Sequence, residues 1–150
     1  MKESMNRYRR PARLAFLAVL GLVTIFFVVK RSRATVGTIS KADLSGAWQM
    51  TFFGDTGCGL SSMVANVTLG TTGTGTATIV THGQCGDSTV TGQPFTITSL
   101  SSNGSGKAGM SCGTGCGFTF QIQVAPDRSV FNLADLTDTG NFLGGVAIHQ

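Results

Sequence analysis

From Leu44 to the end of the chain, apolar and polar residues alternate with a period of two. This alternation is typical of strands with one buried and one solvated face, because successive side chains of a strand point to opposite sides. Turns rich in Gly, Asn, Asp and Ser separate the alternating segments. The pattern predicts eight strands, at residues 47–53, 62–69, 75–81, 93–100, 105–111, 117–124, 128–133 and 142–149.

Short turns between consecutive segments predict an antiparallel meander. An open meander of eight strands exposes two edges, which closure into a barrel removes. We therefore expect residues 44–150 to form an all-β domain, a small eight-stranded antiparallel up-and-down barrel. About twenty apolar residues are expected on its inner face, including Phe142, Val146 and Ile148 of the last strand, and this number fills most of such a barrel.

A different pattern precedes the barrel. Residues 14–29 form an apolar run without a charged residue, flanked on both sides by Lys and Arg. This pattern predicts an N-terminal hydrophobic helix within residues 1–34, which is either a retained signal anchor or a signal peptide cleaved after Ala34. Five basic residues before the run and three after it keep the N-terminus cytoplasmic in both cases. With residues 35–43 as a linker, we expect an extracytoplasmic domain, periplasmic or at the cell surface, anchored or secreted.

The net charge of +4 does not describe the barrel. Eight of the eleven basic residues lie in the leader, whereas three basic residues oppose six acidic ones from Thr35 onward. The positive charge therefore belongs to the membrane-targeting leader and not to the barrel, and we expect no nucleic-acid partner. The expected partners are the membrane, through residues 14–29 where the leader is retained, and an envelope protein or a small apolar ligand.

All four cysteines lie in the exported part, at Cys58, Cys85, Cys112 and Cys116. An even number of cysteines in an oxidising compartment predicts two disulfides. Three pairings are open, and the neighbouring loops of a meander favour Cys58–Cys85 with Cys112–Cys116. A zinc site formed by these thiols and His82 is the alternative, although zinc thiolates suit reducing compartments better.

Alternate loops of a meander meet at the same end of the barrel. The loops after the first, third and fifth predicted strands therefore bring the cysteines, His82 and Asp87 to the end opposite Trp48. A cysteine with His82 and Asp87 would supply a nucleophile, a base and an orienting acid. No enzyme family signature accompanies them, so we predict no catalytic residue, no cofactor and no metal, and expect a protein that is not an enzyme.

Gly46, Ala47 and Trp48 form a G-x-W motif at the start of the first predicted strand. This motif, with the meander, resembles the start of lipocalin- and avidin-type (calycin-type) up-and-down barrels. The resemblance implies that Trp48 closes the barrel base and that the open end binds a ligand. Arg128, in a loop at the same end, is expected either to stack on Trp48 as a base plug or to be an exposed turn charge.

Two functions follow as expectations. The first is a structural or protein-interaction domain of an envelope or secreted protein, with a filled barrel. The second is a lipocalin-like barrel that binds a small apolar ligand through its inner face. The candidate ligand-binding residues are Met50, Phe52, Met63, Phe95, Met110, Phe118 and Phe120.

Overall fold

The computed structural model describes residues 37–57, 59–137 and 142–150. The predicted leader at residues 1–34 lies outside these ranges. Within them, no helix is long and apolar enough to cross a membrane.

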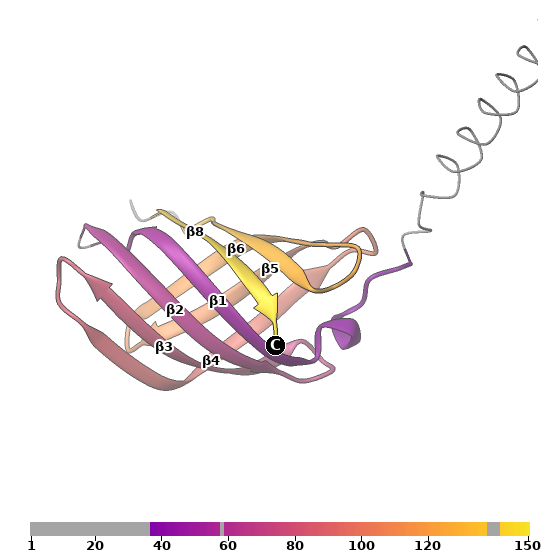
Figure 1. Ribbon diagram of the computed structural model, residues 1–150, viewed down its shortest axis with the longest axis horizontal. Coiled ribbons are helices and arrows are strands. Elements are labelled where there is room, and N and C mark those ends of the chain that lie inside the picture. Colours follow the sequence, from indigo (N-terminus) through magenta and orange to yellow (C-terminus); the bar gives the residue numbers. More distant parts are fainter. Residues whose placement is uncertain (1–36, 58, 138–141) are drawn as a thin grey trace, which may run out of the picture. The chain divides into compact units, whose positions relative to one another are not determined.

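Eight antiparallel strands close into an up-and-down barrel, in which each strand pairs with the next and the last pairs with the first (Figure 1). A short 3-10 helix, η1 (Lys41–Leu44), precedes the first strand. The strands are β1 (Gly46–Asp55), β2 (Leu60–Leu69), β3 (Thr74–Gly83), β4 (Ser88–Leu100), β5 (Ser105–Gly113), β6 (Cys116–Val124), β7 (Val130–Asp135) and β8 (Phe142–His149). The all-β barrel predicted from the alternation is confirmed.

Apolar side chains fill the interior of the barrel. Trp48, Phe52, Phe95 and Phe120 are among its largest fully buried side chains. The rings of Phe52 and Phe120 stack with their centroids 5.3 Å apart, and Phe118 lies 6.0 Å from Phe120. Among the described residues, no polar or charged residue is buried. Because burial of one such ring contributes about 1.5–3 kcal/mol, this interior dominates the stability of the barrel.

The prediction of which β8 residues face the interior is wrong. Phe142, Val146 and Ile148 were expected to point inward but lie on the outer face, where Phe142 and Ile148 are 63% and 51% exposed. Leu143 is buried instead. Gly145 faces Phe52 across the β1–β8 pair, and a Cβ at Gly145 would lie 2.6 Å from the Phe52 ring. The large ring thus occupies this space, so β8 turns its smaller residues inward.

The segment before β1 packs on one end of the barrel. Ile39 and Leu44 belong to the buried core, and the Ile39 N–H donates to the carbonyl of Ser102 at 3.0 Å. The backbone N–H and the hydroxyl of Ser40 both donate to the carboxylate of Asp43 at 2.8 Å, which fixes the start of η1. Part of the stretch predicted as a linker therefore helps to form the closed end of the barrel.

Candidate functional site

Trp48 lies at the closed end, where β1 begins, and is 1% exposed. Its indole N–H donates to the Leu44 carbonyl at 2.8 Å, which ties η1 to β1. Phe131 and His149 lie against the indole, each with its ring centroid 4.7 Å away. The residue of the G-x-W motif thus joins η1, β1, β7 and β8.

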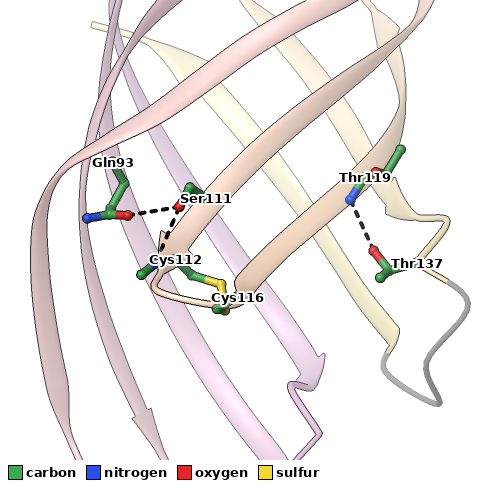
Figure 2. The surroundings of a disulfide bond; sticks show 7 residues. Gln93, Ser111, Cys112, Cys116, Thr119 and Thr137 are labelled. Carbon is green, nitrogen blue, oxygen red and sulfur yellow. Dashed lines mark hydrogen bonds between the residues drawn. A yellow bond between two sulfur atoms is a disulfide. The ribbon is translucent and has the colours of Figure 1, made fainter.

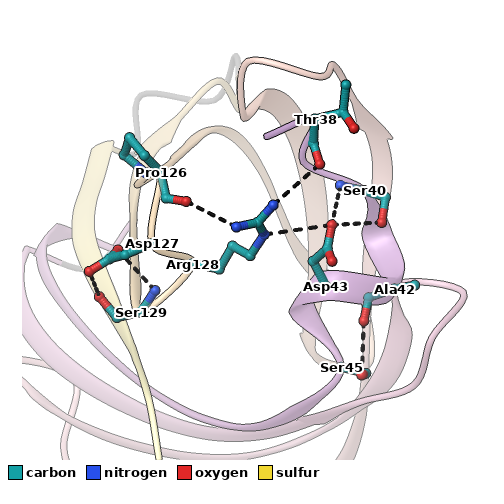
Figure 3. Close-up of polar contacts among 9 residues, drawn as sticks. All are labelled: Thr38, Ser40, Ala42, Asp43, Ser45, Pro126, Asp127, Arg128 and Ser129. Atoms are coloured by element: carbon teal, nitrogen blue, oxygen red, sulfur yellow. Dashed lines mark hydrogen bonds and ion pairs between the residues drawn. The ribbon is translucent and has the colours of Figure 1, made fainter. Parts of the chain in front are cut away.

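Arg128 was expected at this end either to stack on Trp48 or to be an exposed turn charge, and its side chain contacts two backbone carbonyls and a carboxylate (Figure 3). Its guanidinium donates to the carbonyls of Pro126 at 3.2 Å and Thr38 at 3.3 Å. Its Nε lies 3.7 Å from a carboxylate oxygen of Asp43. These contacts connect the β6–β7 turn to the segment before η1, so Arg128 fastens the closed end through backbone carbonyls and one ion pair.

The hydrogen bonds from Ser40 hold the pKa of Asp43 below its usual 3.8, and the charge of Arg128 lowers it further. A carboxyl group with a lowered folded-state pKa stabilises the fold above its unfolded-state pKa, and this contribution is lost as the pH falls through the folded-state value. We therefore expect Asp43→Asn to lower the denaturation midpoint at neutral pH. The difference from the wild type should shrink as the pH falls below about 3.8. Urea titrations at about pH 7 and pH 2.5 measure it, and an unchanged difference would contradict the assignment.

The loops predicted to share the end opposite Trp48 do so, because consecutive strands pair throughout the barrel. His82 Nδ1 contacts Asp87 Oδ1 across the β3–β4 turn, and both side chains are more than 70% exposed. Cys112 and Cys116 form a disulfide at the tip of the β5–β6 hairpin, with their Cα atoms 5.1 Å apart (Figure 2). Cys85 is also disulfide-bonded. Its predicted partner, Cys58, lies outside the described residues.

Disulfide bonding removes the thiol chemistry of the three described cysteines at this end. The sulfurs of Cys85, Cys112 and Cys116 are oxidised, so they are not available as thiolate nucleophiles or zinc ligands. Within the described ranges, no group of three His, Cys, Asp or Glu side chains could hold a metal ion. Of the nucleophile, base and orienting acid considered for this end, the described residues show the contact between His82 and Asp87 on an exposed hairpin.

The candidate ligand-binding residues lie together inside the barrel and are at most 5% exposed. They belong to one core cluster and contact one another, as the stacked rings show. The seven residues are Met50, Phe52, Met63, Phe95, Met110, Phe118 and Phe120. Their surfaces are therefore engaged in packing within the barrel.

The sequence reasoning missed a group of apolar side chains on the outer surface of the barrel at the end opposite Trp48, here called the open end. Phe53, Leu60 and Phe142, here called the apolar wall, are 65%, 66% and 63% exposed. Asp55 pairs with Leu60 on one side and Phe142 on the other, and Phe53 lies two residues before it on the same face. Two residues of the apolar wall, Phe53 and Leu60, line a groove together with His82. The adjacent pairs Phe52-Phe53 and Phe142-Leu143 were the available signal, because a strand with one solvated face needs only one large apolar residue of each pair.

The geometry establishes the architecture that the G-x-W motif implied, an antiparallel up-and-down barrel of eight strands with its tryptophan at the closed end. The chemistry of a site is a separate question, because one fold hosts many functions. Comparison with models of protein families and with curated proteins finds no match for this chain.

Proposed function

We propose that the protein is a non-enzymatic, extracytoplasmic interaction domain. The filled barrel is its scaffold, and the open end is its recognition surface. The observation that carries this proposal is the contrast between two apolar sets. The inner candidates for ligand binding are at most 5% exposed, whereas each residue of the apolar wall is more than 60% exposed.

The contrast has a direct physical meaning. A barrel that takes an apolar ligand needs inner side chains with surface left to contact it, together with a few polar groups that fix its orientation. Here the inner rings contact one another, and no buried polar residue is found among the described residues. Large apolar side chains gathered on an outer surface are typical of interaction sites.

The proposed location rests on the leader and the cysteines. An apolar run flanked by basic residues is typical of export, and disulfides persist in oxidising compartments. The disulfide at the β5–β6 hairpin and the bonded state of Cys85 support that compartment. The leader either holds the barrel at the membrane or releases it after cleavage.

Site-specific photo-crosslinking in the producing cells tests this function. A crosslinking amino acid at Phe53 should give a discrete crosslinked protein, and the same group at Gln123, an exposed residue of β6, should not. Native mass spectrometry of the purified full chain should show no bound small molecule. Equal crosslinking from both positions, or a noncovalently bound apolar molecule, would overturn the proposal; the second result would favour the lipocalin-like alternative.

A further inference from the structure

One strand of the barrel extends beyond its neighbour at the open end. β4 pairs with β3 as far as Thr81–Ser88, but its pairing with β5 ends at Phe95–Met110. Residues 88–90 therefore pair with β3 on one side, and residues 88–92 have no strand partner on the other side within the described part of the chain. Figure 2 shows the reason: the β5–β6 hairpin turns at its disulfide, and the strands beside Gln93 continue past it.

This unpaired stretch, here called the β4 edge, carries only part of the usual protection: Pro94 and the register shift between Ala77 and Ile79 lie at its inner end, whereas residues 88–90 at its outer end include no proline and no charged residue. Exposed edges are usually blunted by lysine, by proline or by a covering loop, because unpaired N–H and C=O groups recruit other strands. Residues 88–92 read Ser-Thr-Val-Thr-Gly and include three β-branched residues and no charge. One carbonyl of the stretch already has a hydrogen-bond donor, since the Gln93 side-chain amide donates to the Thr91 carbonyl at 3.0 Å. Val90 packs against the core and holds the edge in place.

The basic residues of the described barrel lie toward one end, whereas its carboxylates lie at both ends, with Asp43 and Asp127 beside the basic residues at the closed end. Each Lys and Arg among the described residues lies toward the closed end: Lys41 bonds the Thr98 carbonyl, Lys107 pairs with Ser99 in register, and Arg128 binds Thr38. Carboxylates mark the other end, where Asp55 ends β1, Asp87 precedes β4 and Asp135 ends β7. Asp87, the residue directly before β4, places a carboxylate beside the β4 edge, and this charge favours a basic partner.

We propose that the β4 edge binds an extended segment of a partner protein, which adds a strand to the barrel through main-chain hydrogen bonds. The segment has alternating β-branched or apolar residues and at least one flanking Lys or Arg. A groove on the outer face, lined by Val80, His82, Asp87 and Thr89, gives that cation access to the Asp87 carboxylate. The inference rests on the proposed function and names the partner's chemistry and its mode of binding.

One other occupant, a second copy of the chain, fits less well. A second copy of this chain, paired edge to edge, would bring together two ends that each carry Asp55, Asp87 and Asp135, and like charges repel.

A peptide probe tests the proposal on the full chain. The probe is a blocked heptapeptide, Lys-Val-Thr-Val-Thr-Val-Lys, titrated at low salt while amide hydrogen exchange is followed by NMR. We expect exchange to slow at residues 88–92. Asp87→Asn should weaken binding about two- to five-fold, as one exposed charge pair predicts. The matched change at the closed end, Asp127→Asn, should leave binding unchanged.

Three results would overturn this mode of binding. The first is equal affinity for the same peptide N-methylated at alternate residues, which keeps its charges but loses backbone donors. The second is equal affinity for a peptide with Glu in place of Lys. The third is a concentration-dependent dimer that protects residues 88–92 without peptide, which would make a second copy the occupant. Loss of the Phe53 crosslink would instead defeat the proposed function, so the two failures are distinguishable.

Discussion

Replacing Gly54 with alanine is expected to destabilise the barrel by about 3 kcal/mol, because the new methyl group would strike the backbone of the neighbouring strand. Gly54 is buried in β1 at φ +155°, opposite Leu143 of β8. A Cβ there would overlap the Phe142 carbonyl oxygen and lie 3.0 Å from the Cα of Leu143. These are backbone atoms of the pair that closes the barrel, so no side-chain rotation relieves the clash.

Gly144 supplies the matched control for this substitution. It lies in the same β1–β8 pair, opposite Phe53, and nothing lies within 4 Å of a Cβ placed on it. Gly144→Ala should therefore change the free energy of unfolding by less than about 0.5 kcal/mol. Urea denaturation of both variants, followed by tryptophan fluorescence, measures the difference. Equal stabilities would show that the backbone of the β1–β8 pair shifts to make room for the new methyl group, which would contradict the expected clash.

The alternation of residues was sufficient to predict the barrel, because the inner face of most strands is consistently apolar. β6 is an example: Phe118, Phe120 and Ile122 alternate with polar residues and are all buried. The order of the strands followed from the short turns. The shared end of the cysteine-bearing loops followed in turn from that order.

The prediction was wrong where both faces of a strand carry apolar residues. Phe142 and Leu143 are adjacent, so a period of two is satisfied by either face. Which face turns inward depends on Phe52, a residue about ninety positions away, whose ring requires Gly145 opposite it. Sequence spacing along β8 carries no information about that distant ring.

The extra length of β4 was also missed, for a related reason. Its first five residues contain one apolar side chain, Val90, and a glycine at position 92 with φ +67°, so they resembled a loop. These residues nevertheless belong to strand β4, which pairs with β3. A register shift between Ala77 and Ile79 accommodates an extra residue of β4. The candidate binding edge thus arises from a difference in length between neighbouring strands, which only the register reveals.

Replacing Trp48 with alanine is expected to cost about 3–5 kcal/mol, the range for removing a large aromatic side chain from a core. The indole is 1% exposed and packs against Phe131 and His149. Its N–H is also the bond that joins β1 to the Leu44 carbonyl of η1, at 2.8 Å. The substitution therefore removes packing and a hydrogen bond together.

Trp48→Phe separates these two contributions. Phenylalanine keeps an aromatic ring near Phe131 but leaves the buried Leu44 carbonyl without its donor, which costs about 1–3 kcal/mol. The expected order of stability is wild type, then Trp48→Phe, then Trp48→Ala, measured by urea denaturation with circular dichroism, since the fluorophore is lost. Phe53→Ala, at an exposed ring, serves as the near-neutral control. If Trp48→Ala were as stable as this control, the closed end would not depend on its tryptophan, and the G-x-W motif would have no structural role in this barrel.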